Sequence, residues 1–289
     1  MLEPADIVGE PKTIPTADGD LSYAIAGTGP PVLAIQGVGV IGRGWQPQVA
    51  GLSARFRFLT FDNRGVGRSC RGPHPLTIES MAADALAIAD AERLDRFHVL
   101  GHSMGGLIAL HLALTNRDRV KSLALLCTFA DGGRATRPSG KVVVLALGSR
   151  IGTKAMRRKG MIKMIMPDAY IRQHDPATLA RDLGDLFGRD LASQPPIIQH
   201  QLRAMSRYRA IPRLHELSGI PTLVASASHD PIAPPSLGME IAAHIDGARY
   251  VEFSEASHAL PIQLASEVNA LLLEHLVAAE TGSDPAPAH

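Results

Sequence analysis

The 289-residue sequence contains few cysteines, few aromatic residues and almost no net charge. Its two cysteines, Cys70 and Cys127, are too few for a disulfide framework, and we expect both to be apolar fillers near strand ends. No C-x-x-C spacing and no Cys/His cluster is present, so we expect no metal and no cofactor. The aromatic content of 4% and the net charge of +1 also argue against a nucleic-acid-binding surface.

Long apolar runs are absent as well. No uninterrupted apolar stretch reaches the length of about 18 residues that a membrane-spanning helix needs. Residues 1–6 have neither the basic region nor the apolar region of a signal peptide. We therefore expect a cytoplasmic protein without membrane insertion, acting on a small molecule and not on nucleic acid. Its 45% hydrophobic and 20% charged residues are ordinary for a globular enzyme.

Short apolar runs alternate with longer amphipathic stretches along most of the chain. Strands are predicted near residues 12–16, 21–26, 32–35, 56–61, 120–127, 222–225 and 249–253, and helices near 45–52, 77–94, 235–245 and 261–277. The run at 32–35 is apolar throughout, which is typical of a strand buried on both faces of a parallel sheet. Strands alternating with helices predict an α/β fold with a mostly parallel, doubly wound sheet.

This alternation stops after Phe129 and resumes near residue 210. The intervening stretch is rich in Arg, Lys and Met and is interrupted by several prolines. We expect residues 131–209 to form an inserted helical cap, or lid. The core would then consist of residues 1–130 and 210–280, and residues 281–289 would be a flexible tail.

A candidate nucleophile lies at Ser103, between a short apolar strand and a stretch that is expected to form an amphipathic helix. Gly101, Ser103 and Gly105 fit the G-x-S-x-G pattern, which places a serine on a tight strand-to-helix turn. The turn needs a strained backbone at the serine, and a Cβ atom at position 101 or 105 would clash where strand and helix approach. The helix N-terminus also directs free N–H groups at the position where an oxyanion would form.

A serine hydroxyl needs a general base and a group that orients this base. Asp230 follows the strand at 222–225, and His258 follows the strand at 249–253, so both belong to loops beyond the carboxyl ends of strands. The order Ser103, Asp230, His258 is the order expected for this architecture. Asp131 is an alternative for the acid, because it follows the strand at 120–127.

With four motifs in this order, the sequence resembles the α/β-hydrolase superfamily, in the branch of lidded esterases and enol-lactonases. The motifs are residues 101–106, residues 62–69, the Asp230 loop and the terminal His258. The resemblance covers nearly the whole chain outside the cap. It implies an α/β-hydrolase fold, with Ser103, His258 and Asp230 as a catalytic triad. A serine nucleophile argues against the dehalogenases and epoxide hydrolases of this superfamily, which use aspartate.

Two backbone N–H groups are expected to form the oxyanion hole, those of Met104 and Val38. The loop that carries Val38 begins Gln36-Gly37, where many relatives have His-Gly. The swap leaves backbone donation unaffected, and we expect Gln36 to position the loop or to touch substrate. Gly37, Gly101 and Gly105 support the site, and we expect His102 to pack under the turn.

Residues 62–69 contain two glycines but lack the ending of a nucleotide-binding loop. We interpret this stretch as a structural turn in which Arg64 pairs with Asp62. In the cap, Met156, Met161, Met164 and Met166 are candidates for an adaptable acyl pocket or for packing against the core. The basic front half of the cap is interpreted as a solvated face; attraction of an anionic substrate or contact with an anionic membrane surface are the alternatives.

These features together predict a cofactor-free serine hydrolase that cleaves a small to medium carboxylic ester through an acyl-enzyme. A lactonase, a thioesterase, a carbon–carbon bond hydrolase or a perhydrolase could use the same triad. A small-molecule receptor on a hydrolase scaffold and an acyltransferase are the alternatives from other classes.

Overall fold

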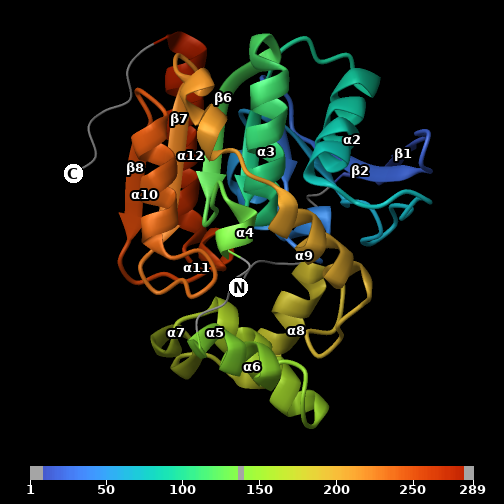
Figure 1. The fold of residues 1–289 in the computed structure, drawn as a ribbon, viewed down its shortest axis with the longest axis vertical. Helices are drawn as coiled ribbons and strands as arrows, with labels where there is room; N and C mark the ends of the chain where they lie inside the picture. The colour runs from blue at the N-terminus through green and yellow to red at the C-terminus, as the bar shows by residue number, and fades with distance from the viewer. Residues whose placement is uncertain (1–8, 136–139, 283–289) are drawn as a thin grey trace.

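The computed structural model describes residues 9–135 and 140–282. Within these ranges an eight-stranded sheet has the strand order β1-β2-β4-β3-β5-β6-β7-β8 (Figure 1). Strands β1 and β2 pair antiparallel, as do β2 and β4, and all other neighbours are parallel. The strands are β1 (Lys12–Ile14), β2 (Leu21–Ala26), β3 (Pro31–Ile35), β4 (Arg57–Phe61), β5 (Phe97–His102), β6 (Val120–Leu126), β7 (Thr222–Ala227) and β8 (Arg249–Phe253).

Successive side chains of a strand point to opposite faces of the sheet. Each face of this sheet packs in a separate hydrophobic cluster. In β3, Leu33 and Ile35 belong to one hydrophobic cluster, and Val32 and Ala34 belong to the other. All four side chains are fully buried, which explains the continuous apolar run. The mostly parallel, doubly wound α/β sheet expected from the sequence is thereby confirmed.

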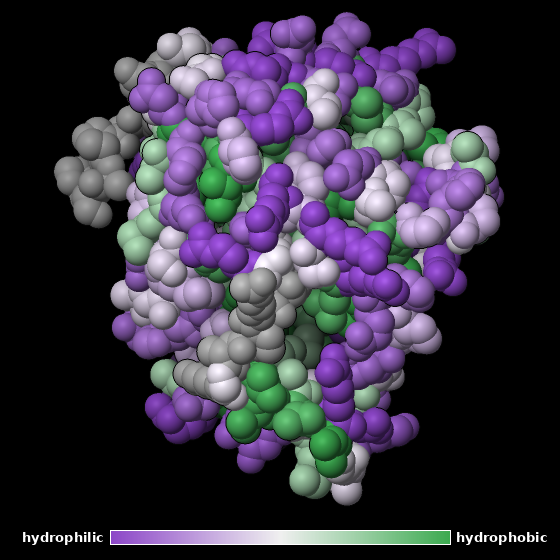
Figure 2. All heavy atoms as spheres, viewed as in Figure 1, coloured by the Kyte–Doolittle hydropathy of each residue, from purple (hydrophilic) through white to green (hydrophobic). Residues whose placement is uncertain are grey.

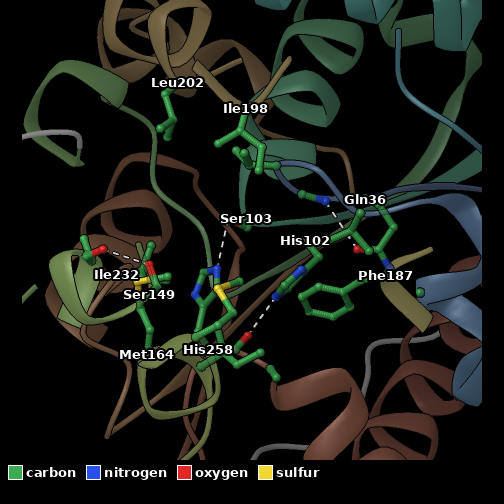
Figure 3. Close-up of a pocket in the computed structure, with 18 of the residues that line it drawn as sticks. Gln36, His102, Ser103, Ser149, Met164, Phe187, Ile198, Leu202, Ile232 and His258 are labelled. Atoms are coloured by element: carbon green, nitrogen blue, oxygen red, sulfur yellow. Dashed lines mark hydrogen bonds between the residues drawn. The ribbon is translucent and has the colours of Figure 1, made fainter. Parts of the chain in front are cut away.

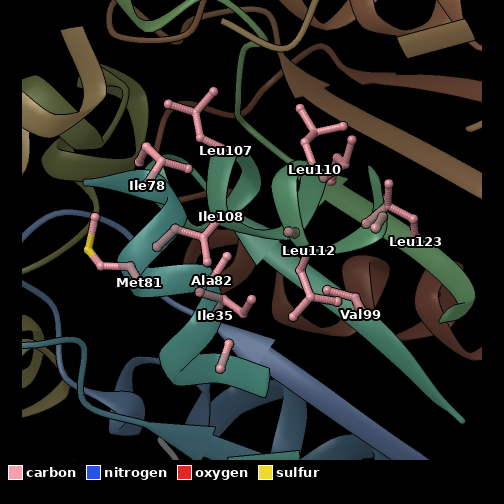
Figure 4. Packing of buried hydrophobic residues seen from close by; sticks show 14 of the residues in the cluster. Ile35, Ile78, Met81, Ala82, Val99, Leu107, Ile108, Leu110, Leu112 and Leu123 are labelled. Atoms are coloured by element: carbon pink, nitrogen blue, oxygen red, sulfur yellow. The ribbon is translucent and has the colours of Figure 1, made fainter. Parts of the chain in front are cut away.

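Helices α2 (Ile78–Ala91), α3 (Met104–Thr115) and α10 (Pro235–His244) cover one face, and α1 (Gln46–Leu52) and α12 (Ala265–Thr281) cover the other (Figure 1). Figure 4 shows how α2 and α3 meet the sheet: Ile78 and Met81 of α2 lie beside Ile108 of α3, with Ile35 of β3 nearby. Helix α2 begins after a capping box, in which the Thr77 hydroxyl accepts from the backbone of the third helical residue.

A helical segment lies between β6 and β7. It comprises α4 (Gly132–Ala135), α5 (Gly140–Gly148), α6 (Lys154–Ile165), α7 (Asp168–Arg172), α8 (Pro176–Phe187) and α9 (Ile197–Arg207). Its two ends are joined by backbone hydrogen bonds, from Gly132 N to Tyr208 O (3.0 Å) and from Ala210 N to Ala130 O (2.7 Å). In Figure 1, α5 to α8 lie beyond the edge of the sheet where the parallel strands end.

Several local expectations need correction. Helix α3, expected to be amphipathic, has buried side chains around nearly its whole circumference because it packs between the sheet and other helices. The helix expected at residues 261–277 is two helices, α11 (Leu260–Gln263) and α12, because Leu264 has a non-helical backbone. Strand β1 ends at Ile14, so Pro15 lies outside it, although β1 is the edge strand expected from that proline. Cys70 is exposed and is not an apolar filler, whereas Cys127 is buried.

The remaining elements are short 3-10 segments, η1 (Gly42–Trp45), η2 (Arg117–Arg119) and η3 (Ile211–Leu217). Of the expected tail, residues 283–289 lie outside the described residues. None of the helices in the described ranges is both long enough and apolar enough to cross a membrane.

A buried histidine on β5 links the sheet to α12. His98 lies 2.8 Å from Ser122 Oγ through Nδ1 and 2.9 Å from Glu280 Oε1 through Nε2. Burial lowers the pKa of His98 from 6.5 to about 4. Between these pH values the unfolded chain binds a proton that the folded protein excludes, so this contribution to stability is present above pH 6.5 and is lost as pH falls through 4.

We therefore expect the His98→Gln variant to depend less on pH than the wild type in that window. Each excluded proton contributes about 1.4 kcal/mol per pH unit to the slope of the unfolding free energy. Urea unfolding at several pH values measures both slopes. His244→Gln, which replaces an exposed histidine on α10, is the matched control. Equal slopes for wild type and His98→Gln would contradict this assignment.

Candidate active site

Ser103 occupies the turn between β5 and α3, with a backbone φ of +56°. A Cβ atom at Gly101 would lie 2.5 Å from the Gly105 carbonyl oxygen, and one at Gly105 would overlap the carbonyl oxygen of Ile35. The expected clashes at positions 101 and 105 are thus confirmed. The glycines let α3 approach β3 and β5 closely enough to hold the serine in this left-handed backbone conformation.

The structure brings together the three side chains expected to act as a triad. His258 Nε2 lies 3.0 Å from Ser103 Oγ (Figure 3). On the other side of the ring, His258 Nδ1 lies 2.7 Å from Asp230 Oδ2. All three residues are buried. They arrive from separate places in the chain: the turn after β5, the loop after β7 and the loop after β8. Parallel strands end at the same edge of the sheet, which is why these loops meet.

The carboxylate of Asp230 is held so that one oxygen faces the imidazole. Its Oδ1 accepts the backbone N–H groups of Ile232 (2.8 Å) and Ala233 (2.9 Å), which leaves Oδ2 for His258. With Nδ1–H donating to Asp230, the Nε2 lone pair of His258 can accept the serine hydroxyl proton. The alternative acid, Asp131, instead accepts the N–H of Arg134 and pairs with Arg209, so it does not contact the imidazole.

The loop after β3 runs beside the serine. A Cβ atom at Gly37 would lie 3.0 Å from Ser103 Cβ, so only glycine allows this approach without displacement. The next residue, Val38, lines the cavity in front of the serine. Met104 is the first residue of α3, where a backbone N–H has no acceptor within the helix. Met104 thus follows Ser103 directly in the chain, and Val38 lies in the wall of the cavity that Ser103 also lines.

Gln36 is buried and lines the same cavity (Figure 3). Its Oε1 accepts the N–H of Gly37 at 3.3 Å, and its backbone carbonyl accepts from Asn63 Nδ2 at 2.9 Å. These two hydrogen bonds, one accepted by the side chain of Gln36 and one by its backbone, hold the start of the loop after β3 in place. They favour a loop-positioning role for Gln36, while the side chain remains in reach of a molecule in the cavity.

His102 does more than pack under the turn. Its Nε2–H donates to the backbone carbonyl of His258 at 2.8 Å, and the two ring centroids are 5.0 Å apart. Burial lowers the pKa of His102 to about 3, so its ring is neutral near pH 7. A neutral ring adds no repulsion when the neighbouring imidazole takes up a proton.

A cavity of about 370 Å³ opens in front of Ser103 and His258. Its walls are largely apolar and come from both the core and the 131–209 segment; among the labelled residues of Figure 3 these include Met164, Phe187, Ile198, Leu202 and Ile232. Of the four methionines considered from the sequence, Met161 and Met164 line the cavity, Met166 is buried in the core of the helical segment, and Met156 is exposed. No metal-binding group of His, Cys, Asp or Glu exists among the described residues.

Two residues of the helical segment that the sequence analysis did not identify hold the loop that carries Val38. Gln201 of α9 is fully buried, and its Oε1 accepts the N–H of Gly39 at 2.8 Å. Arg189, after α8, donates to the carbonyl of Gly39 at 3.2 Å through Nε. Gly39 follows Val38 in the chain, so these two residues of the helical segment hold the loop in which Val38 lies. No local sequence pattern marks these contacts, which join residues 162 and 150 positions apart.

Two further findings concern neighbours of the site. Burial, together with the nearby carboxylate of Asp230, raises the pKa of the Cys127 thiol at the end of β6 well above its usual value, so the thiol stays protonated. The predicted pair of Arg64 and Asp62 is wrong. Arg64 pairs with Asp84 of α2, while the Asp62 carboxylate accepts backbone N–H groups of Gly42 and Arg68.

Known proteins resemble this chain over most of its length. Residues 30–263 match the family model described as alpha/beta hydrolase fold. A relative from Azorhizobium caulinodans, named "Putative carbamate hydrolase RutD", is 30% identical over 265 residues, covering 89% of this chain and 94% of that protein.

Solved structures show the same similarity. The enol-lactonase from Burkholderia xenovorans LB400 is 31% identical with a TM-score of 0.75, covering 89% of this chain and 96% of that one. A thermophilic esterase from Thermogutta terrifontis is 26% identical with a TM-score of 0.76, covering 94% and 99%.

The contact between Gln201 and Gly39 gives a testable prediction. Gln201→Leu leaves a buried N–H without its acceptor and lets the loop that carries Val38 move. Loss of one oxyanion donor costs about 10²- to 10³-fold in kcat, so we expect its displacement to lower kcat by roughly tenfold or more. Steady-state kinetics on an active ester measure this change.

Gln199→Leu, the same substitution on the exposed face of α9, is the matched control and should leave kcat unchanged. Thermal unfolding of both variants checks that they are folded. A Gln201→Leu enzyme with wild-type kcat would contradict a positioning role.

Proposed function

This chain belongs to the α/β hydrolase family, and from this premise we propose that it is a serine hydrolase that cleaves a small to medium carboxylic ester. The observation that carries the proposal is the hydrogen-bonded chain from Ser103 through His258 to Asp230, with the serine and histidine in the wall of an apolar cavity. A buried polar chain of this kind costs free energy to desolvate, and nucleophile activation is the chemistry for which it is suited.

The first half of the reaction forms an acyl-enzyme. His258 Nε2 accepts the Ser103 proton as the hydroxyl oxygen attacks the ester carbonyl carbon. The resulting oxyanion accepts hydrogen bonds from the N–H groups of Val38 and Met104, and the N-terminus of α3 adds a favourable dipole. Asp230 stabilises the imidazolium and keeps its ring oriented. The imidazolium then donates its proton to the departing alcohol oxygen, and the acyl group remains on Ser103.

The second half repeats these steps with water. His258 removes a proton from a water molecule, whose oxygen attacks the acyl carbonyl. The same two N–H groups stabilise the second oxyanion. When it collapses, the proton returns from His258 to Ser103 Oγ and the carboxylic acid is released. The enzyme is regenerated without any external cofactor in this scheme.

We propose that residues 131–209 act as the cap that selects the substrate. Met164 and Leu202 from this segment and Ile232 from the core line the same cavity, so neither part forms it alone. A volume of about 370 Å³ lies near the lower end of the range for ligand pockets, about 300–1,000 Å³. This size and the apolar walls favour small to medium acyl groups.

A lactone is the second candidate substrate, because a lactone is a cyclic ester that opens by the same attack. The 31% identity to the Burkholderia enol-lactonase favours this candidate. A carbamate is a further substrate to test, in view of the printed name of the Azorhizobium relative.

The experiment is hydrolysis of p-nitrophenyl esters from acetate to palmitate by the wild type and by Ser103→Ala. We expect activity that peaks at a short or medium chain, because longer acyl groups exceed the cavity. Ser103→Ala should lose about 10⁴-fold or more in kcat, since the whole acylation pathway is removed. A panel of lactones and carbamates is run in parallel.

Ser122→Ala is the matched control, because Ser122 also hydrogen-bonds a histidine but lies fully buried at His98, away from the cavity. It should keep wild-type activity if it folds, which circular dichroism checks. Undiminished hydrolysis by Ser103→Ala would contradict the proposal. Activity on lactones or carbamates alone that Ser103→Ala abolishes would change the proposed substrate class and still support Ser103 as the nucleophile.

A further inference from the structure

The helical segment carries an unusual group of exposed apolar side chains. Among the described residues six large hydrophobic side chains are exposed, and five of them lie between positions 143 and 156. We term these five the cap ridge: Val143, Val144, Leu147, Ile151 and Met156, each between 41% and 68% exposed. Figure 2 shows hydrophobic spheres gathered over α5 and α6 at one end of the molecule, beside a hollow. Such gathering on one helix pair indicates a contact surface.

The cap ridge sits on a closely packed helical hairpin. A Cβ atom at Gly160 of α6 would overlap the backbone of Gly148 at the end of α5, so the two helices touch there through their glycines. In the turn between them, a Cβ atom at Gly152 would lie 2.9 Å from Met156 Sδ. Met156 of α6 therefore packs against the turn that carries Ile151.

The surroundings of the cap ridge are strongly basic. From residue 132 to residue 167 the sequence contains nine Lys and Arg and no Asp or Glu. Arg134 and Arg158 pair with Glu240 and Asp190 from outside this stretch. Four other cations are exposed and form no ion pair with another described residue: Arg150, Lys154, Lys159 and Lys163.

We propose that the cap ridge and these cations dock the protein on an anionic lipid surface. Apolar side chains bordered by Lys and Arg are the composition that binds such interfaces, because the aliphatic groups enter the headgroup region and the cations meet lipid charge. Charge also disfavours a second copy of this chain as the occupant. Ridge-to-ridge packing would bring two sets of like charges together, because the 132–167 stretch that carries the ridge contains no Asp or Glu.

Helix α5 lies between the cap ridge and the cavity. Val142, Ala146 and Ser149 of α5 and its C-terminal end line the cavity, whereas Val144 and Leu147 point away from it and are exposed. Docking through α5 would therefore place one wall of the cavity next to the lipid, where apolar esters concentrate. This consequence for substrate supply rests on the proposed function; the docking itself does not.

The test is co-sedimentation of the full chain with phosphatidylcholine vesicles and with vesicles of phosphatidylcholine and phosphatidylglycerol. We expect binding to the anionic vesicles that weakens as salt is added, and much weaker binding to the neutral ones. The double variant Val144→Ser/Ile151→Ser should bind at least about tenfold more weakly, because two inserted aliphatic side chains are lost. Lys154→Gln/Lys159→Gln should bind more weakly only to the anionic vesicles.

Met239→Ser is the matched control, since Met239 is the exposed apolar residue outside the ridge, on α10, and it should bind as the wild type does. All variants should keep wild-type hydrolysis of soluble esters, which separates loss of docking from loss of catalysis. Absence of wild-type binding to anionic vesicles at low ionic strength would overturn the proposal. Val144→Ser/Ile151→Ser binding as tightly as the wild type would also overturn it. So would a wild-type protein that is a dimer in solution and becomes a monomer in this variant.

Discussion

The backbone contact between the start of α3 and the end of β3 is the constraint on which the candidate site depends. Gly105 packs against the carbonyl of Ile35, and Gly101 packs against Gly105, so no side chain separates helix from sheet. This closeness holds Ser103 at a positive φ and presents its hydroxyl to His258. The strained conformation persists because the buried sheet and helix on both sides determine it.

Around this contact, hydrogen bonds tie each reacting group to a different part of the fold. The imidazole of His258 is fixed by Asp230 on one side, and its backbone is fixed by neutral His102 on the other. The loop that carries Val38 is held by Gln201 and Arg189 of the helical segment through Gly39. The segment proposed to choose the substrate therefore also supports the loop proposed to stabilise the transition state. A change in cap packing should alter both specificity and turnover.

Much of the fold follows from local patterns, because buried parallel strands read as continuous apolar runs and the glycine-flanked serine needs one backbone geometry. The triad positions follow from strand order, since loops after parallel strands meet at one edge. Contacts made by side chains far apart in sequence leave no such pattern. The partner of Arg64 is on α2, and Gln201 reaches Gly39 across the cap. The cap ridge also has no local signature, because the apolar residues of a helix do not show from sequence alone whether they pack inside the protein or lie on its surface.

Covalent trapping determines whether Ser103 is an activated nucleophile in the folded protein. The folded protein is treated with an alkyl fluorophosphonate, and the modified peptide is identified by mass spectrometry. If His258 activates Ser103 in the folded protein, one adduct forms, on Ser103. It forms in the native protein and does not form after denaturation. No adduct on the native protein, or modification of another serine with Ser103 left free, would contradict this activation.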